Sequence, residues 1–183
     1  MLAGMDIAIT KGRGRDYLVF ARADGSQAAT DFPHKGPVPH DAVHCLVESA
    51  LGLADGFCGW VAGGTAPQAL AEMAKAAGHA SAARAGLPEP RIVGLLQAER
   101  LVECFEAELW AGLAGSPPCD EAVFAEVARV ACAASHVPLP PLAPGAVGAA
   151  RRALNGFAGG WIAAPVGHKA VLEWRLPQAA QGD

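Results

Sequence analysis

Two histidines and two carboxylates are concentrated in the segment 36–52, which reads GPVPHDAVHCLVESALG. His40 and His44 are four residues apart. Asp41 follows the first histidine, and Glu48 lies four residues beyond the second. Residues four apart on an α-helix share one face, with Cβ atoms about 5–6 Å apart, so both imidazoles can bind the same ion. The segment therefore predicts a divalent-metal site, with zinc as the expected ion.

The expected roles of Asp41 and Glu48 follow from their distance to such an ion. Asp41 occupies the position at which zinc peptidases carry the glutamate that acts as general base. Its side chain is one methylene shorter, so it reaches less far toward a metal-bound water, or instead orients His44. Glu48 lies two turns from His40, too far to share a metal, so we expect it to support the site or to pair with His44. Asp41 and Glu48 are the candidate catalytic residues.

The same segment also has a purely structural interpretation. Asp41 in the first turn of a helix is favourable because of the helix dipole alone. If Asp41 were the N-cap residue, His40 would lie outside the helix and the two imidazoles would not share a face. The polar side chains of the segment would then form a hydrogen-bonded cluster without a metal.

A carboxylate elsewhere in the chain completes a ligand set. Glu99 lies in LLQAERLVECF, residues 95–105, where leucine and valine surround it at helical spacing. A carboxylate on an apolar face is costly to bury unless it is paired or binds a metal. With His40 and His44, Glu99 would form a His₂-carboxylate set that leaves coordination positions open, as catalytic sites need. The other residues that could take its place are Glu103, His79 and His136.

The elements that must position these residues indicate an α+β fold. Short β-branched and aromatic runs separated by turn residues predict a three-stranded antiparallel meander over residues 5–32. KAVLEWRL predicts a C-terminal strand within 168–176 that joins this sheet. Residues 39–160 form the helical part, so a small antiparallel sheet packs beside a bundle of about five helices in one domain, 1–183.

The expected helices follow the spacing of apolar residues and the positions of glycine and proline. The first is ended by Gly52 in the left-handed conformation. The apolar, glycine-rich ADGFCGWVAGG is expected to be buried, and residues 80–88 form a connection. The predicted helices cover residues 39–51, 66–77, 90–113, 116–134 and 146–157.

Composition narrows the function classes. The chain of 183 residues has a net charge of −4 and no basic run longer than KGRGR, so we expect no nucleic-acid partner. Charged residues, Gly or Pro interrupt every apolar stretch, which predicts no membrane span. The first residues do not have the pattern of a signal peptide. The five cysteines form no CxxC pair, which favours reduced thiols in a cytoplasmic protein.

The segment 32–64, FPHKGPVPHDAVHCLVESALGLADGFCGWVAGG, resembles a segment of small, functionally uncharacterised bacterial proteins. Their pattern is close to His-Asp-x-x-His-x-x-x-Glu followed by Gly-Phe-x-Gly, and it covers about a fifth of this chain. The resemblance implies a shared site without naming its reaction. The helix also partially resembles the His-Glu-x-x-His helix of zinc peptidases, but Asp41 replaces the glutamate, which argues against proteolysis.

Two hypotheses from different classes follow. In the first, a divalent metal, expected to be zinc, is bound by His40, His44 and Glu99 and polarises a water in a metal-dependent hydrolase of unknown substrate. In the second, the protein is a non-catalytic module whose apolar helices mediate self-association into a homo-oligomer. The His, Asp and Glu side chains would then be a structural cluster.

Overall fold

A four-stranded antiparallel sheet forms one side of the structure, a computed structural model that describes residues 4–76 and 86–176. Its strands lie in the spatial order β3-β2-β1-β4. Met5 of β1 is opposite Arg22 of β2 on one side and Trp174 of β4 on the other. The predicted meander and the C-terminal strand that joins it are therefore confirmed. The strands are β1 (Met5–Thr10), β2 (Arg15–Arg22), β3 (Gln27–Pro33) and β4 (Lys169–Trp174).

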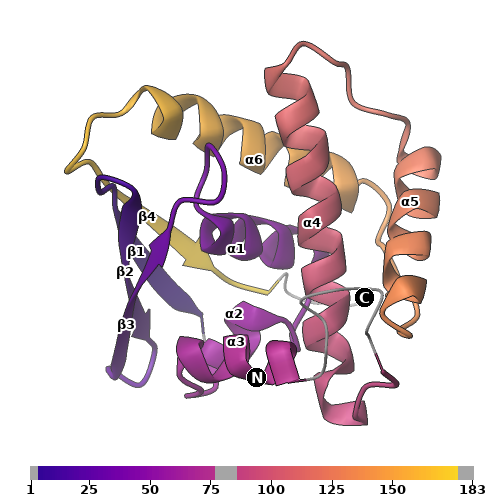
Figure 1. Cartoon of the computed structure of the whole chain (residues 1–183), viewed down its shortest axis with the longest axis horizontal. Coiled ribbons are helices and arrows are strands. Elements are labelled where there is room, and N and C mark those ends of the chain that lie inside the picture. Colours follow the sequence, from indigo (N-terminus) through magenta and orange to yellow (C-terminus); the bar gives the residue numbers. More distant parts are fainter. Residues whose placement is uncertain (1–3, 77–85, 177–183) are drawn as a thin grey trace, which may run out of the picture.

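One face of the sheet is apolar because side chains alternate between the two faces along β1 and β2. Met5, Ile7 and Ile9 of β1 are buried, as are Leu18 and Phe20 of β2. The helices cover this face (Figure 1). The α+β architecture predicted from the sequence is therefore present.

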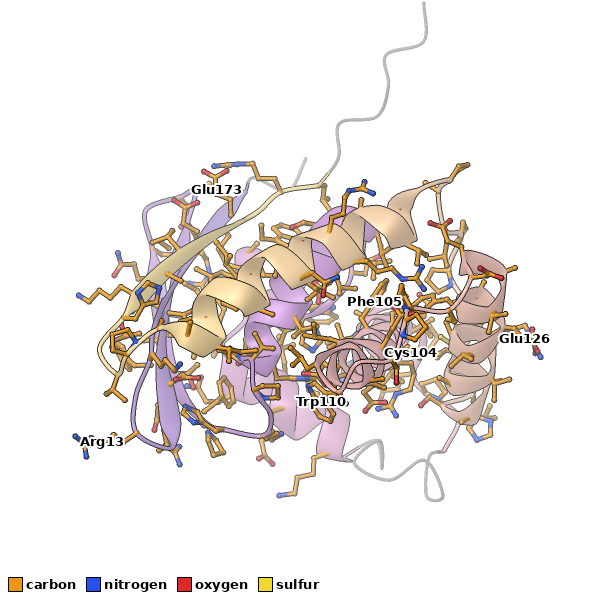
Figure 2. All side chains as sticks on the ribbon, turned by 90° about the horizontal axis from the view of Figure 1, so that it is seen from above. Arg13, Cys104, Phe105, Trp110, Glu126 and Glu173 are labelled. Atoms are coloured by element: carbon orange, nitrogen blue, oxygen red, sulfur yellow. The ribbon has the colours of Figure 1, made fainter. Side chains whose placement is uncertain are left out.

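Six α-helices, one more than expected, lie within the described residues. α1 is central: it contacts α4, α6 and β4, and Figure 1 shows it between the sheet and α4. Figure 2, which looks along α4, shows the sheet on one side of the molecule and α5 on the other. A short 3₁₀ turn, η2 (Pro90–Ile92), precedes α4. The helices are α1 (His40–Leu51), α2 (Phe57–Ala62), α3 (Pro67–Ala76), α4 (Val93–Leu113), α5 (Glu121–Ala134) and α6 (Ala146–Ala163).

Helix α1 is buried on most of its surface because it packs between two apolar clusters. Ala42 belongs to the cluster beneath the sheet. Val43 and Val47 belong to the cluster that α1 forms with α4, α5 and α6. His44 and Glu48 are therefore enclosed by apolar surroundings, where an unpaired polar group is costly. Their partners define the candidate site described below.

The glycine-rich segment is buried as expected, but two local features differ from the prediction. The segment predicted only to be buried contains α2, a helix too short and glycine-rich to show helical periodicity. Gly59 is required there because a Cβ would lie 1.8 Å from the Ala54 carbonyl oxygen. The helix expected from Ser116 begins at Glu121, after the N-cap residue Asp120. The delay has a physical cause, because the ring of Pro118 disfavours helical backbone at the residue before it.

The remaining predicted boundaries differ little, except that α6 continues to Ala163 rather than ending near residue 157. Residues 77–85 lie outside the described residues, so His79 and most of the predicted connection 80–88 are not assessed. Among the described helices, none has the length and apolar character needed to cross a membrane.

Candidate metal site

Helix α1 starts where both histidines fall on one face. Its N-cap residue is Pro39, with extended backbone, so His40 is the first helical residue. The alternative in which Asp41 caps the helix is therefore excluded. The helix ends at Gly52, which is left-handed with φ 71°, and the Leu53 N–H donates to the Glu48 carbonyl. Local sequence signals at both ends thus fix which α1 side chains point together.

The two imidazoles and a carboxylate of α4 converge on one point. His44 Nε2 lies 3.2 Å from His40 Nε2 and 3.1 Å from Glu99 Oε2. His40 Nε2 lies 3.4 Å from the same carboxylate oxygen. Two ligand atoms held about 2.0–2.1 Å from a tetrahedral zinc ion are about 3.3–3.4 Å apart, so the spacing matches that of a metal ligand set. His40, His44 and Glu99 form a group in which a metal ion could be held.

Carboxylates also hold the other nitrogen of each ring. His40 Nδ1 lies 2.9 Å from Glu106 Oε1, and His44 Nδ1 lies 2.8 Å from Glu48 Oε1. Metal-binding histidines commonly donate their second N–H to a carboxylate, which fixes the tautomer and the ring orientation. Both Nε2 atoms are therefore left to face Glu99. Glu48 therefore occupies the place expected from its spacing, as a partner of His44.

Glu48 is fully buried, and its two carboxylate oxygens have separate partners. Oε1 pairs with His44, and Oε2 accepts the backbone N–H of Cys58 in α2. Gly56 packs directly against this carboxylate, since a Cβ at that position would lie 2.5 Å from the Glu48 carboxyl carbon. Glu48 does not line the cavity beside the histidines. Its position is that of a residue that orients His44 rather than one that contacts a substrate.

The pKa values reflect a closely paired cluster. Burial alone would lower the pKa of His40, but its hydrogen bonds with Glu106 and Glu99 outweigh this effect and raise it to about 9. Burial alone would also lower the pKa of His44. The charge of Glu99 and the hydrogen bond with Glu48 outweigh this effect and raise it. For Glu99, burial would raise the pKa, but the two imidazoles hold it well below its usual range. Without a metal, these pKa shifts favour protonated His40 and His44 rings beside an ionised Glu99 carboxylate.

A cavity of about 290 Å³ opens beside the group. His40, His44 and Glu99 line it from the helical side, and so does Asp41. Asp41 is 5% exposed, and burial raises the pKa of its carboxyl group. The rest of the wall includes Leu18, Phe32, Val38, Phe57, Leu95 and Trp161. A ligand in the cavity would thus meet these apolar surfaces and, on the helical side, the polar side chains of this group.

Two of the three alternative third ligands, Glu103 and His136, are among the described residues, and neither joins the group. Glu103 pairs with Arg100 at 2.8 Å, and its side chain is 47% exposed. His136 is exposed at the end of α5. Glu106 is a partner of His40 that was not predicted, although its spacing gave a signal. It follows Glu99 by seven residues, about two helical turns, and so lies on the same face of α4.

No protein-family model, curated protein or solved structure matches this chain. The resemblances described for the segment 32–64 therefore stay predictions, and the interpretation of the site depends on its geometry.

Proposed function

We propose that this protein binds one divalent metal ion, zinc first among the candidates, through His40, His44 and Glu99, and hydrolyses an ester or amide bond with it. The observation that carries the proposal is the arrangement around the two rings. Both Nε2 atoms lie 3.1–3.4 Å from one Glu99 oxygen, while Glu106 and Glu48 hold the two Nδ1 atoms. A cluster with only a structural role has no need to orient both rings in this way.

Three protein ligands leave coordination positions for a water and a substrate oxygen. Because all three line the cavity, those positions are within reach of a ligand bound there. A divalent ion at this point polarises a carbonyl group and increases the acidity of a bound water. Asp41 is the candidate general base, since its carboxylate lines the same cavity and pairs with no described lysine or arginine.

The cavity favours acyl compounds over phosphate esters. Its wall is mostly apolar, and only one metal-binding group was found among the described residues, whereas many phosphate-cleaving sites use a pair of ions. The Lys11 ammonium in the wall already donates to the carbonyls of Trp161 and Ala164, each at 2.8 Å. Its N–H groups are therefore already used within the fold, and Lys35 is the other ammonium in the wall.

The test compares Glu99→Gln with Glu103→Gln, which makes the same chemical change one turn along α4, outside the cavity. We expect the wild-type protein and Glu103→Gln to bind one equivalent of zinc with affinities within about twofold. Glu99→Gln should bind it at least about 100-fold more weakly, beyond the usual effect of losing a supporting carboxylate. Elemental analysis of the purified proteins and titration with chelator-buffered zinc give the two readouts. Substoichiometric metal in all three proteins, with no zinc binding, would refute the proposal.

The second candidate function is the non-catalytic module. One observation favours it: Val123, Val127 and Val130 lie at helical spacing along α5, and each is more than half exposed. Their spacing of four and three residues places them on one face. In this alternative, Glu99 only bridges two protonated imidazoles, and Glu99→Gln would lower the thermal stability without any change in metal content.

A further inference from the structure

A second histidine–carboxylate pair lies in the wall of the same cavity, on the side of the sheet. Asp16 is on β2, and His34 directly follows β3. The His34 Nε2 atom lies 2.8 Å from Asp16 Oδ1. Both residues line the cavity that His40, His44 and Glu99 line from the helical side. The metal site proposed above uses neither of them.

Asp16 occupies a position where a carboxylate is unusual. It is in register with Leu18 and Phe20, which point into the core, and it is 4% exposed. Burying a carboxylate there is costly unless it is hydrogen-bonded. Its Oδ1 atom accepts the Gly12 N–H at 3.0 Å and pairs with His34, and no described lysine or arginine pairs with it. The charge of this carboxylate is therefore directed at one imidazole.

His34 is held in place while one of its nitrogens remains available. Its backbone N–H donates to the Gly14 carbonyl at 2.9 Å, which ties the residue to the turn between β1 and β2. Two residues later, Gly36 packs on α4, where a Cβ would lie 2.7 Å from the Trp110 ring. Asp16 holds Nε2, and no described residue bonds to Nδ1. The ring is thus oriented and about one third exposed toward the cavity.

We propose that His34 is the proton donor to the leaving group in the hydrolysis, and that Asp16 is the residue that positions it. The inference rests on the proposed function. The water oxygen forms a bond to the acyl carbon, and Asp41 takes the proton that the water loses. As the bond from the acyl carbon to the leaving oxygen or nitrogen breaks, its electron pair takes a proton from His34. Solvent then carries the proton from Asp41 to His34, which restores both residues.

The roles proposed for His34 and Asp16 have a chemical reason. A carboxylate hydrogen-bonded to a histidine fixes the orientation of its ring, so the same nitrogen is presented to the reacting group throughout the reaction. An alcohol or amine leaving group needs a proton as it departs, whereas nitrophenolate departs readily as an anion. The contribution of His34 should therefore depend on the leaving group, which a purely structural role would not produce.

The experiment uses two ester series with the same acyl groups, acetyl to octanoyl, and either a p-nitrophenol or an ethanol leaving group. Zinc-loaded wild-type protein is compared with His34→Gln and with His136→Gln, an exposed histidine outside the cavity. We expect His34→Gln to slow hydrolysis of the ethyl esters by about 10²- to 10⁴-fold, and that of the nitrophenyl esters by less than about tenfold. Zinc affinity should stay at the wild-type value, whereas the melting temperature should fall because the buried Asp16 loses its histidine partner. The control His136→Gln should hydrolyse both ester series at wild-type rates.

Asp16→Asn should give the same leaving-group-selective loss, and the double variant should be no slower than His34→Gln alone, because both changes remove one function. Equal losses on the two ester series, or no loss on either, would overturn the proposal while leaving the metal-dependent hydrolysis intact. If the zinc-loaded wild type hydrolyses neither series, the proposed function fails and this inference fails with it. The wild-type measurement thus distinguishes failure of the proposed function from failure of the proposal for His34.

Discussion

The contact between Gly56 and Glu48 allows a sharp test of how the site is supported. In Gly56→Ala, the new Cβ would lie 2.5, 2.6 and 2.8 Å from the three atoms of the Glu48 carboxylate. Restoring an ordinary contact near 3.4 Å requires a displacement of about 0.9 Å. The two bonds of this carboxylate, to His44 at 2.8 Å and to the Cys58 N–H at 2.9 Å, cannot both remain within hydrogen-bond range after such a shift.

The size of the effect follows from the burial of the groups involved. Leaving a buried donor or acceptor unsatisfied costs about 1–3 kcal/mol. In a chain of this size, 1 kcal/mol changes the melting temperature by about 2–4 °C, so Gly56→Ala should lower it by roughly 2–12 °C. Because Glu48 also orients His44, zinc affinity should fall by about 10- to 100-fold. One substitution outside the cavity therefore affects both stability and metal binding.

Thermal unfolding of the metal-free protein and chelator-buffered zinc titration measure the two effects. Gly63→Ala is the matched control, because it adds the same methyl group at the other end of α2. A Cβ at Gly63 would lie 3.4 Å or more from its neighbours, and the backbone there has φ −76°, which alanine adopts readily. If Gly56→Ala has the same melting temperature and the same zinc affinity as Gly63→Ala, then Glu48 does not hold His44 for metal binding, and the reasoning is wrong.

Three further predictions concern titration and association. The pKa of His40 is raised to about 9, so a metal must displace a proton at neutral pH. Zinc affinity should therefore rise by about tenfold per pH unit between pH 6 and 8 for each proton released. An affinity independent of pH would contradict this. Glu106→Gln removes the charge that helps to hold this proton, so the rise in zinc affinity should level off at a lower pH than in the wild type, and identical curves would rule out the contact. If the exposed valines of α5 mediate self-association, Val127→Glu should shift sedimentation toward the monomer, whereas a wild-type protein that is monomeric at every concentration removes that candidate function.

Local residue patterns within single helices and strands predicted the sheet, the extent of α1 and the three candidate metal ligands. Short runs of β-branched and aromatic residues separated by turn residues predicted the sheet, because such side chains favour strands. The four-residue spacing of His40 and His44 placed both rings on one face of α1, and Gly52 ended that helix. An acidic residue at an apolar helix position singled out Glu99. Such features depend on a few neighbouring residues, so they can be read without the fold.

The tertiary structure decided which faces meet. Glu106 reaches His40 only because α4 packs against α1, and two-turn spacing on α4 gives no indication of its partner. The short α2 exists because its apolar side chains are buried and its N-terminus supplies an N–H to Glu48. Asp16 was detectable as a carboxylate at an inward position of a strand, but its pairing with His34 depends on how β3 leads into the loop beside the cavity. Contacts between distant segments arise from packing of the whole chain, and spacing along the sequence does not encode them.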